Sequence, residues 1–407
     1  MSKGLIKNTV YLYILTIVKI TFPLLTLPYL TRVLSVDTYG LVAYVKAYIS
    51  YVQLFLDFGF LLSATRVIAE ANGNVMEISR STWDTIIEKL FLGGVAFFVT
   101  VIVTYAIPIL SENRLFVWLY FVSCIVTVFI PDFLYRGIER MEYAAIPFVC
   151  SKLVVLFFTF SIIKSDSDIM FIPILEIGGN FVAATISLLF LKKCGIVLVR
   201  GKLQQWIKDI KESSVYFFSN FATTFFGAMT TLIAGVYLST KDIAFWSLSM
   251  QVVTVAKSMY NPITNSIYPY MVLNRDLKLV RKLALLFSIP LALGCIIIMF
   301  FGGEIMALIG GKAYYDVGII LKLLLPVFVA SFYSMLYGWP VLGAINKVKE
   351  TTATTLAAAF IQIVCIASII LFNKFSLINL TVCCCVSEIA LLLLRLAVFK
   401  RNIAKFK

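Results

Sequence analysis

The stretch LALLFSIPLALGCIIIMFF, residues 283–301, decides the class of fold. It holds no charged side chain and approaches the length of about 20 residues that an α-helix needs to cross the hydrocarbon core of a bilayer. A membrane-spanning strand would instead show about ten residues of alternating hydrophobicity. Because lipid offers no partner to backbone N–H and C=O groups, this stretch predicts a spanning helix, whose hydrogen bonds are internal.

Similar apolar runs recur on both sides of this segment along the whole chain. The 407 residues are 61% hydrophobic and only 14% charged, whereas a soluble protein carries about 25% charged residues. We therefore expect an all-α integral membrane protein without a soluble domain. We predict twelve membrane spans, at residues 9–30, 38–63, 86–108, 116–135, 144–163, 171–191, 213–237, 243–272, 283–301, 317–341, 355–372 and 376–398.

The basic residues are distributed unequally between the two sides of these spans. With the N-terminus placed in the cytoplasm, 22 of the 35 lysines and arginines lie on the cytoplasmic side, six lie on the opposite side and seven lie within spans. Loops that stay in the cytoplasm are enriched in Lys and Arg. The net charge of +14 therefore reflects topology, and it predicts a multi-pass protein with both termini in the cytoplasm.

The most basic connection, residues 192–212, falls between the sixth and seventh spans. Its position suggests two halves of six helices each, an N-terminal lobe at 1–191 and a C-terminal lobe at 213–407. The segment 192–212 is then a cytoplasmic linker, with a composition that suits an amphipathic helix on the membrane surface.

Span two carries a polar stripe inside the membrane. Lys46, Ser50, Gln53 and Asp57 are spaced four, three and four residues apart and so share one helix face, while aromatic side chains occupy the opposite face. Polar groups at this depth face either an aqueous cavity or a buried polar network. Lys46 and Asp57 lie about 16 Å apart along the axis and cannot pair with each other.

Other spans carry lysines in similar surroundings. Span eight places Thr254, Lys257 and Asn261 on one face, and span one places Lys19 near a polar face. Buried cations without an evident set of carboxylates favour an anionic ligand, and phosphate is the natural candidate. Lys152 in span five is a fourth candidate. Structural ion pairing remains the alternative for all four lysines.

The sequence favours transport over covalent chemistry. It contains no histidine, no nucleophile–base pair, no Gly-rich phosphate loop and no zinc-binding spacing among its eight cysteines. We expect no enzymatic activity, no catalytic residue, no metal and no cofactor. If transport is coupled to protons, a carboxylate must carry them, and Asp57 and Glu388 are the candidates because both lie well inside spans.

Two segments resemble the polysaccharide transporter family, which contains O-antigen and capsule repeat-unit flippases. These segments are PYLTRVLSVDTYGLVAYVKAYISYVQLFLDFGFLLSATRVIAE, residues 28–70, and PDFLYRGIERMEYAAIP, residues 131–147. The Pro-rich eighth span, with SMYNPITNSIYPYM at residues 258–271, agrees with the same family. The family lies in a superfamily that also includes multidrug and toxin extruders and the lipid II flippase.

The resemblance implies twelve helices in two lobes around a central V-shaped cavity. It also implies that oligosaccharide linked to undecaprenyl pyrophosphate moves across the bacterial inner membrane by alternating access, coupled to an H⁺ or Na⁺ gradient. Other polysaccharide-assembly proteins are the implied partners. In related flippases, cations on spans one, two and eight face the cavity, where this chain has Lys19, Lys46 and Lys257.

Two other functions remain open at this stage. A multidrug exporter of the same superfamily would favour a carboxylate-rich cavity for cationic drugs, but the deepest charges here are mostly lysines. A polysaccharide polymerase or ligase would need a long external loop with catalytic groups, and the longest external connection, about 302–316, is too short.

Overall fold

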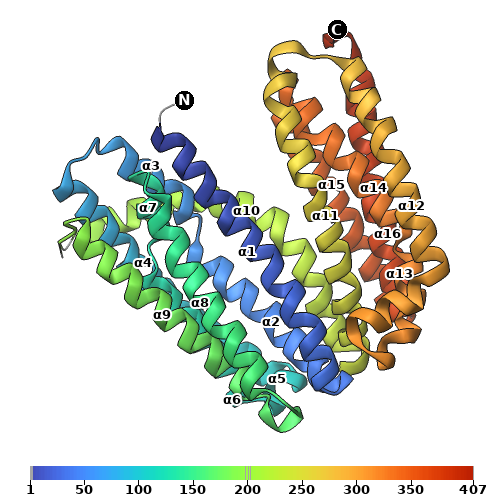
Figure 1. The fold of residues 1–407 in the computed structure, drawn as a ribbon, viewed down its shortest axis with the longest axis horizontal. Coiled ribbons are helices and arrows are strands. Elements are labelled where there is room, and N and C mark those ends of the chain that lie inside the picture. Colours follow the sequence, from blue (N-terminus) through green and yellow to red (C-terminus); the bar gives the residue numbers. More distant parts are fainter. Residues whose placement is uncertain (1–2, 198, 200, 202, 407) are drawn as a thin grey trace. The chain divides into compact units, whose positions relative to one another are not determined.

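The computed structural model describes residues 3–197, 199, 201 and 203–406. Every regular element in this part is a helix (Figure 1). Side chains are not described at some helical positions, namely 3–6, 9, 203–204, 219–228, 262, 265 and 269. The chain divides into two compact units, Met1–Leu232 and Ile233–Lys407, and each is described by itself.

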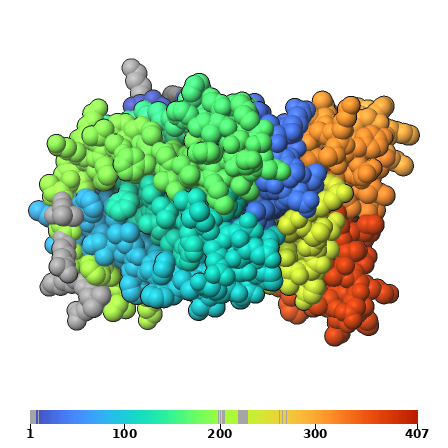
Figure 2. All heavy atoms as spheres, turned by 90° about the horizontal axis from the view of Figure 1, so that it is seen from below, coloured from blue at the N-terminus to red at the C-terminus, as the bar shows by residue number. Residues whose placement is uncertain are grey.

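The first unit contains nine helices and most of a tenth. Their bounds are α1 Lys3–Val33, α2 Val36–Asp57, α3 Phe60–Glu70, α4 Val75–Ala106, α5 Pro108–Glu112, α6 Arg114–Val126, α7 Asp132–Gly137, α8 Met141–Ile162, α9 Phe171–Lys193 and α10 Leu203–Tyr237, with short 3₁₀ turns at Thr127–Phe129 and Asp166–Asp168. Helices α8 and α9 pack along each other, as do α1 with α8 and α6 with α9. Figure 2 shows one face of this unit, on which the green atoms of α8 and α9 lie beside the blue-green atoms around α6.

The second unit begins in the last turn of α10 and is also built from helices. Their bounds are α11 Thr240–Asn274, α12 Leu277–Gly310, α13 Gly318–Leu323, α14 Leu325–Leu336, the π-helical segment η4 Tyr337–Leu342, α15 Val348–Leu371 and α16 Leu377–Arg401. Short 3₁₀ turns lie at Lys312–Val317, Gly343–Ile345 and Ile403–Lys405. Helix α16 packs against both α14 and α15.

The membrane-protein fold class is confirmed. Within the described residues, ten helical segments are long and apolar enough to cross a bilayer, and they correspond to the predicted spans one to six and nine to twelve. The predicted spans 213–237 and 243–272 fall inside α10 and α11, which are each 35 residues long. The arrangement is therefore consistent with twelve spans.

Three predicted spans are interrupted in the structure. Span two breaks where Phe58 and Gly59 adopt positive φ values of 35° and 79°. Span four breaks at Pro131, which precedes α7, because proline removes a backbone donor. Span ten is divided by the junction of α13 with α14 and by Gly338, whose ψ is −114°. Hydropathy shows that these segments are apolar, but it does not register local backbone breaks.

The break at Gly59 is fixed by a close approach of α10. A Cβ atom at this position would lie 2.7 Å from Cβ of Tyr216 and 2.8 Å from the backbone of Phe217 and Ser213. The rings of Phe58 and Phe217 stack with their centroids 4.5 Å apart. Glycine is required here because it tolerates both the positive φ and the contact with α10.

The connections are shorter than the sequence suggested. In the predicted connection 64–85, α3 continues to Glu70 and α4 already starts at Val75, where Asn74 caps the backbone N–H of Met76 and Glu77. In 192–212, residues from Leu203 onward form the start of α10. Residues 198, 200 and 202 of this predicted linker lie outside the described part.

Candidate functional site

A polar cavity of about 700 Å³ lies inside the first unit. Side chains from α1, α2, α3, α4, α6, α7, α8 and α9 line it. Six of the ten residues singled out in the sequence are on its wall: Lys19, Lys46, Ser50, Gln53, Asp57 and Lys152. The other four, Thr254, Lys257, Asn261 and Glu388, belong to the second unit.

Helix α2 has two chemically different faces. Its four polar stripe residues line the 700 Å³ cavity. On the other side, Tyr48, Tyr51 and Phe55 line a separate apolar cavity of about 270 Å³ together with residues of α4 and α10. The hydroxyl of Tyr48 donates to Oγ1 of Thr100 at 2.9 Å, so its one polar atom is satisfied there. The helix thus separates an ion-lined space from an apolar one.

One carboxylate holds two of the cavity lysines. Glu176 of α9 accepts a hydrogen bond from Nζ of Lys152 at 3.1 Å, and Nζ of Lys46 lies 3.9 Å from its other oxygen. The Glu176 side chain is 15% exposed, whereas that of Lys46 is 41% exposed. Since one carboxylate neutralises one ammonium group, this cluster retains a positive charge.

Asp57 anchors a second polar cluster. It accepts from Nζ of Lys89 at 2.9 Å and from Nε2 of Gln53 at 3.1 Å. Oε1 of Gln53 in turn accepts from Sγ of Cys124 at 3.0 Å and from Oγ1 of Thr127 at 3.2 Å. The network fixes the orientation of the Gln53 amide and places Asp57 beside a cation rather than alone.

Lys19 has no ion-pair partner among the described residues. Its Nζ lies 5.5 Å from the centroid of the Phe148 ring, and Nζ of Lys152 lies 6.0 Å from the same centroid. Lys152 also lies 4.9 Å from the Phe22 ring. Aromatic faces stabilise ammonium groups without neutralising them, so the contact with Phe148 leaves both lysines charged.

The cavity wall carries more positive than negative charge. Its basic residues are Lys19, Lys46, Lys89, Arg136 and Lys152, and its acidic residues are Asp57, Asp132 and Glu176. Five cations against three carboxylates leave a formal surplus of +2. The ion pairs match Lys89 with Asp57, and they leave Lys46 and Lys152 to share the single carboxylate of Glu176.

Sequence reasoning missed two contributors to this site. Lys89 lies near a predicted span end, where its ammonium could reach the membrane surface, but in the structure it pairs with Asp57. Glu176 lies among the four carboxylates inside predicted spans, with Asp57, Asp132 and Glu388, but the sequence analysis assigned it no role in the site. A carboxylate in the middle of a span was the available signal, since intramembrane charges are rare unless they have partners.

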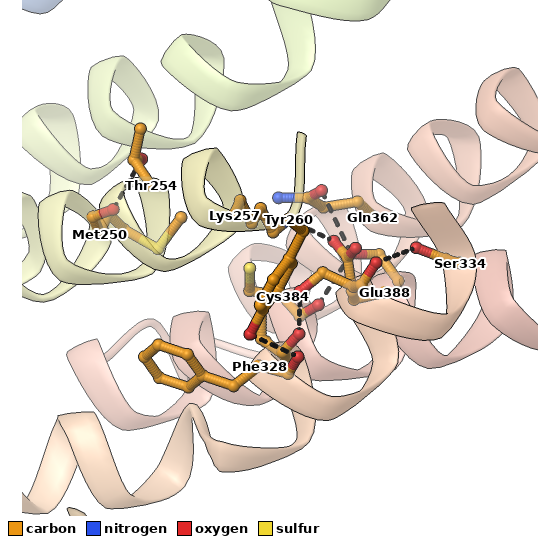
Figure 3. Close-up of polar contacts among 12 residues, drawn as sticks. Met250, Thr254, Lys257, Tyr260, Phe328, Ser334, Gln362, Cys384 and Glu388 are labelled. Carbon is orange, nitrogen blue, oxygen red and sulfur yellow. Dashed lines mark hydrogen bonds and ion pairs between the residues drawn. The ribbon is translucent and has the colours of Figure 1, made fainter. Parts of the chain in front are cut away.

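In the second unit, α11, α14, α15 and α16 converge on a polar cluster (Figure 3). Nζ of Lys257 donates to Oε2 of Glu388 at 2.9 Å, and the two side chains are 34% and 16% exposed. Arg395, two turns further along α16, donates to the backbone oxygen of Ser334 and to Oγ1 of Thr355. Both basic side chains thus have acceptors.

Thr254 and Asn261 flank Lys257 on α11, and both are exposed. The Thr254 hydroxyl donates back to the carbonyl oxygen of Met250 at 2.8 Å, as Figure 3 shows. This local bond leaves the hydroxyl oxygen available as an acceptor.

The sequence matches a family described as "Polysaccharide biosynthesis protein" over residues 5–274. It is 24% identical over 370 residues to the "Putative O-antigen transporter" of Escherichia coli (strain K12), and the match covers 88% of each chain. It is 26% identical over 267 residues to the protein of the same name in Shigella dysenteriae, where the match covers 65% of this chain and 66% of that one.

The fold is similar to solved membrane transporters. An inward-facing multidrug resistance MATE family transporter of the MOP superfamily superposes with a TM-score of 0.73 at 11% identity, covering 98% of both chains. The lipid II flippase MurJ in an inward closed conformation superposes with a TM-score of 0.69 at 14% identity, covering 97% of this chain and 87% of that one. At these identities the likeness concerns the fold alone.

Proposed function

This chain belongs to the polysaccharide biosynthesis protein family, and from that premise we propose that it is a flippase for a lipid-linked oligosaccharide. The proposed substrate is an O-antigen or related surface polysaccharide unit attached to undecaprenyl pyrophosphate. The protein would carry it from the cytoplasmic to the periplasmic leaflet by alternating access. Its named relatives are transporters. This protein is likewise a transporter and not an enzyme.

The observation that carries this proposal is the charge of the cavity in the first unit. A pyrophosphate diester bears two negative charges, and the cavity wall has a surplus of +2. Moving such a headgroup through the bilayer requires compensation for its lost hydration, because an unpaired buried charge is very costly. Lys19, Lys46 and Lys152 are the residues that we propose bind the phosphates.

The geometry suggests how binding and release would be balanced. An incoming phosphate competes with Glu176 for Lys46, whose ammonium lies 3.9 Å from that carboxylate and is therefore loosely held. When the phosphate leaves, Glu176 again neutralises the lysine. Ammonium groups act as point charges and do not impose one phosphate orientation, which suits a ligand that must leave on the other side. Ser50 and Gln53 offer hydrogen bonds beside them.

We propose that the second unit adds Lys257, with Thr254 and Asn261 beside it, to the substrate path. Ion coupling would use Asp57 and Glu388, each of which is paired with a lysine at 2.9 Å. Protonation of either carboxylate would release its lysine for an anionic ligand. This exchange would link proton uptake to substrate binding, with H⁺ as the coupling ion.

The proposed location is the bacterial inner membrane, with both termini and the linker 192–212 in the cytoplasm. The moving parts would be the halves 1–191 and 213–407. The surplus of positive charge argues against export of cationic drugs, because such ligands would be repelled from the cavity wall.

The proposal is tested in proteoliposomes that contain the purified protein and undecaprenyl-pyrophosphate-linked oligosaccharide. A membrane-impermeant sugar-binding probe added outside should gain access to the initially inner half of the substrate, and empty liposomes should show no such gain. An equal rate with and without protein would contradict the proposal. Faster movement of a cationic dye but not of the lipid-linked sugar would favour a drug exporter.

A further inference from the structure

The charged residues on the wall of the first cavity fall into two groups that differ in formal charge. In the first group, Lys46 and Lys152 share the carboxylate of Glu176. The charges that act on Glu176 are those of these two lysines. Together with Lys19, the third lysine of the proposed phosphate site, this part of the wall has three cations and one carboxylate, which gives a formal charge of +2.

The second group has no net formal charge. It consists of the Asp57–Lys89 ion pair and of Asp132 and Arg136 in α7. Both members of the ion pair act on Asp132 electrostatically, and so does Lys19, which therefore lies between the two groups. Two cations and two carboxylates cancel. The cavity thus has a positive part, suited to phosphate, and a charge-balanced part, which the proposed phosphate site does not use.

Helix α7 is held in place by the helices on two sides of it. It packs on α3, at the end of the first unit where α1 begins (Figure 1). Oγ1 of Thr65 in α3 donates to the backbone oxygen of Phe133 at 3.0 Å. The hydroxyl of Tyr135 donates to the backbone oxygen of Ser187 in α9 at 2.6 Å. The remaining side of α7 borders the cavity, where it presents Asp132 and Arg136.

Asp132 and Arg136 have no partner for their side chains. Their spacing of four residues would allow an ion pair on the surface of a helix. Within the part of the chain that the structure describes, however, neither side chain forms an ion pair or a hydrogen bond. Nε of Arg136 is enclosed by protein and has no acceptor. A firmly held helix therefore offers the cavity one strong acceptor and one set of strong donors.

We propose that Asp132 and Arg136 bind the sugar that is attached directly to the pyrophosphate of the substrate. This inference rests on the proposed flippase function and adds the part of the wall that recognises the sugar. The carboxylate accepts hydrogen bonds from sugar hydroxyls, and the guanidinium donates to sugar oxygens. Because the two formal charges cancel, the pair binds an uncharged sugar without competing with the lysines for the phosphates.

The order of the two groups along the cavity matches the order of the groups in the substrate. Asp57 lies three helical turns from Lys46, about 16 Å along α2, and Lys19 lies between the positive and the balanced part. A lipid in the cytoplasmic leaflet holds its pyrophosphate at the membrane surface and its sugar further toward the cytoplasm. With the orientation proposed above, α7 lies at the cytoplasmic end of the cavity, where that sugar would enter.

The test compares two lipids that differ only in the sugar. One is undecaprenyl pyrophosphate that bears a single uncharged hexose, and in the other a methyl group replaces the hexose. Both are pyrophosphate diesters with two negative charges. Their dissociation constants are measured by thermophoresis on the purified full-length protein in detergent. The measured quantity is the constant for the methyl lipid divided by that for the hexose lipid, since a change in the net charge of the cavity affects both lipids alike.

In the wild type this ratio should be at least about ten, because hydrogen bonds to charged groups favour the hexose lipid. Asp132→Ala and Arg136→Met, which keeps much of the arginine stem, should each lower the ratio about tenfold. The matched controls are Glu139→Ala and Arg140→Met, which remove the same charges at exposed positions just after α7. Neither of these residues lines the cavity, so both controls should keep the wild-type ratio.

The outcomes separate this inference from the flippase proposal. Tight binding of both lipids with a wild-type ratio near one would overturn the sugar assignment and leave the phosphate site standing. Binding of neither lipid would overturn both. An unchanged ratio in D132A and R136M would also refute the assignment. Should either variant misfold and lose both lipids, Asp132→Asn and Arg136→Gln replace them and should lower the ratio in the same direction; an unchanged ratio there would count equally against it.

Discussion

Glu176 is the residue on which the charge of the first cavity depends. It holds Lys152 at 3.1 Å and Lys46 at 3.9 Å, so removal of one lysine leaves the carboxylate with the other. Lys152, the closer partner, therefore contributes more to folding. Lys46, the more distant partner, is more available to a ligand.

The first prediction separates these contributions. Lys46→Ala should leave membrane abundance unchanged, because Glu176 keeps its closer partner, while surface polysaccharide falls at least about tenfold through loss of a charged contact of about 1.5–3 kcal/mol. Arginine at position 46 should retain part of the function, and glutamate none.

Lys152→Ala, in contrast, should lower membrane abundance as well as surface polysaccharide, since Glu176 is left with the more distant lysine. Immunoblots beside polysaccharide staining measure both; normal polysaccharide in K46A would remove Lys46 from the mechanism.

The second prediction concerns Lys257 and Glu388. Lys257→Ala alone leaves a carboxylate that is 16% exposed without its ion-pair partner, and an uncompensated charge that is largely removed from water destabilises the fold. Its membrane abundance should fall. The double variant Lys257→Ala/Glu388→Gln should restore abundance. Surface polysaccharide should remain absent in the double variant if Lys257 contacts substrate; its recovery would assign the pair a purely structural role.

At the scale of single elements, the helix break between α2 and α3 determines how the first unit packs. It ends the polar stripe of α2 at Asp57 and lets α10 pack directly on the backbone of Gly59. The position of the Asp57 carboxylate therefore depends on a glycine two residues away.

A third prediction follows from the interruption. Gly59→Ala should lower the apparent melting temperature of the purified protein, because φ is +79° and the added Cβ meets α10 at 2.7 Å. The cost should exceed the left-handed penalty of about 1 kcal/mol. The matched control is Gly94→Ala in α4, where an added Cβ meets nothing within 4 Å. That change should be neutral or stabilising by about 0.5–1 kcal/mol; equal melting of both variants would contradict the argument.

The two faces of α2 give a fourth prediction. In a variant that lacks the eight native cysteines, Ser50→Cys should react with a small hydrophilic maleimide, because Ser50 is exposed in the cavity. Val52→Cys should react at least about tenfold more slowly, since Val52 is 5% exposed and faces the apolar side. Mass spectrometry of the labelled protein measures both rates, and equal rates would show that no aqueous cavity borders α2.

The sequence predicted element types and helix faces better than partners. The spacing of Lys46, Ser50, Gln53 and Asp57 sufficed to place them on one face, because helical periodicity is local. That Lys46 lies near Glu176 and Asp57 pairs with Lys89 depends on how separate helices pack. One sequence contains no record of such distances. The break at Gly59 was not predicted from the sequence for the same reason, since it depends on a contact with α10.

For the whole molecule, the fifth prediction is the orientation. The cytoplasmic excess of basic residues, 22 against six, predicts that a reporter enzyme active only in the cytoplasm will be active after residue 407 and within 194–202. The same reporter should be at least about tenfold less active within residues 164–170 or 373–376, on the opposite side. An inactive C-terminal fusion in a protein of normal abundance would contradict an even number of spans.

The packing of α10 also bears on how the protein is made. The first unit is completed only by α10: the Tyr44 hydroxyl binds the backbone oxygen of Leu232 at 3.2 Å, and Phe58 stacks on Phe217. A ribosome delivers this helix after all six preceding spans, so the nascent chain has its first nine helices in the membrane while the Gly59 interruption is still uncovered. The insertion machinery must shelter that surface until translation passes residue 232. A chain arrested at residue 193 should therefore be degraded faster than one arrested at residue 237, although the longer one exposes an additional helix.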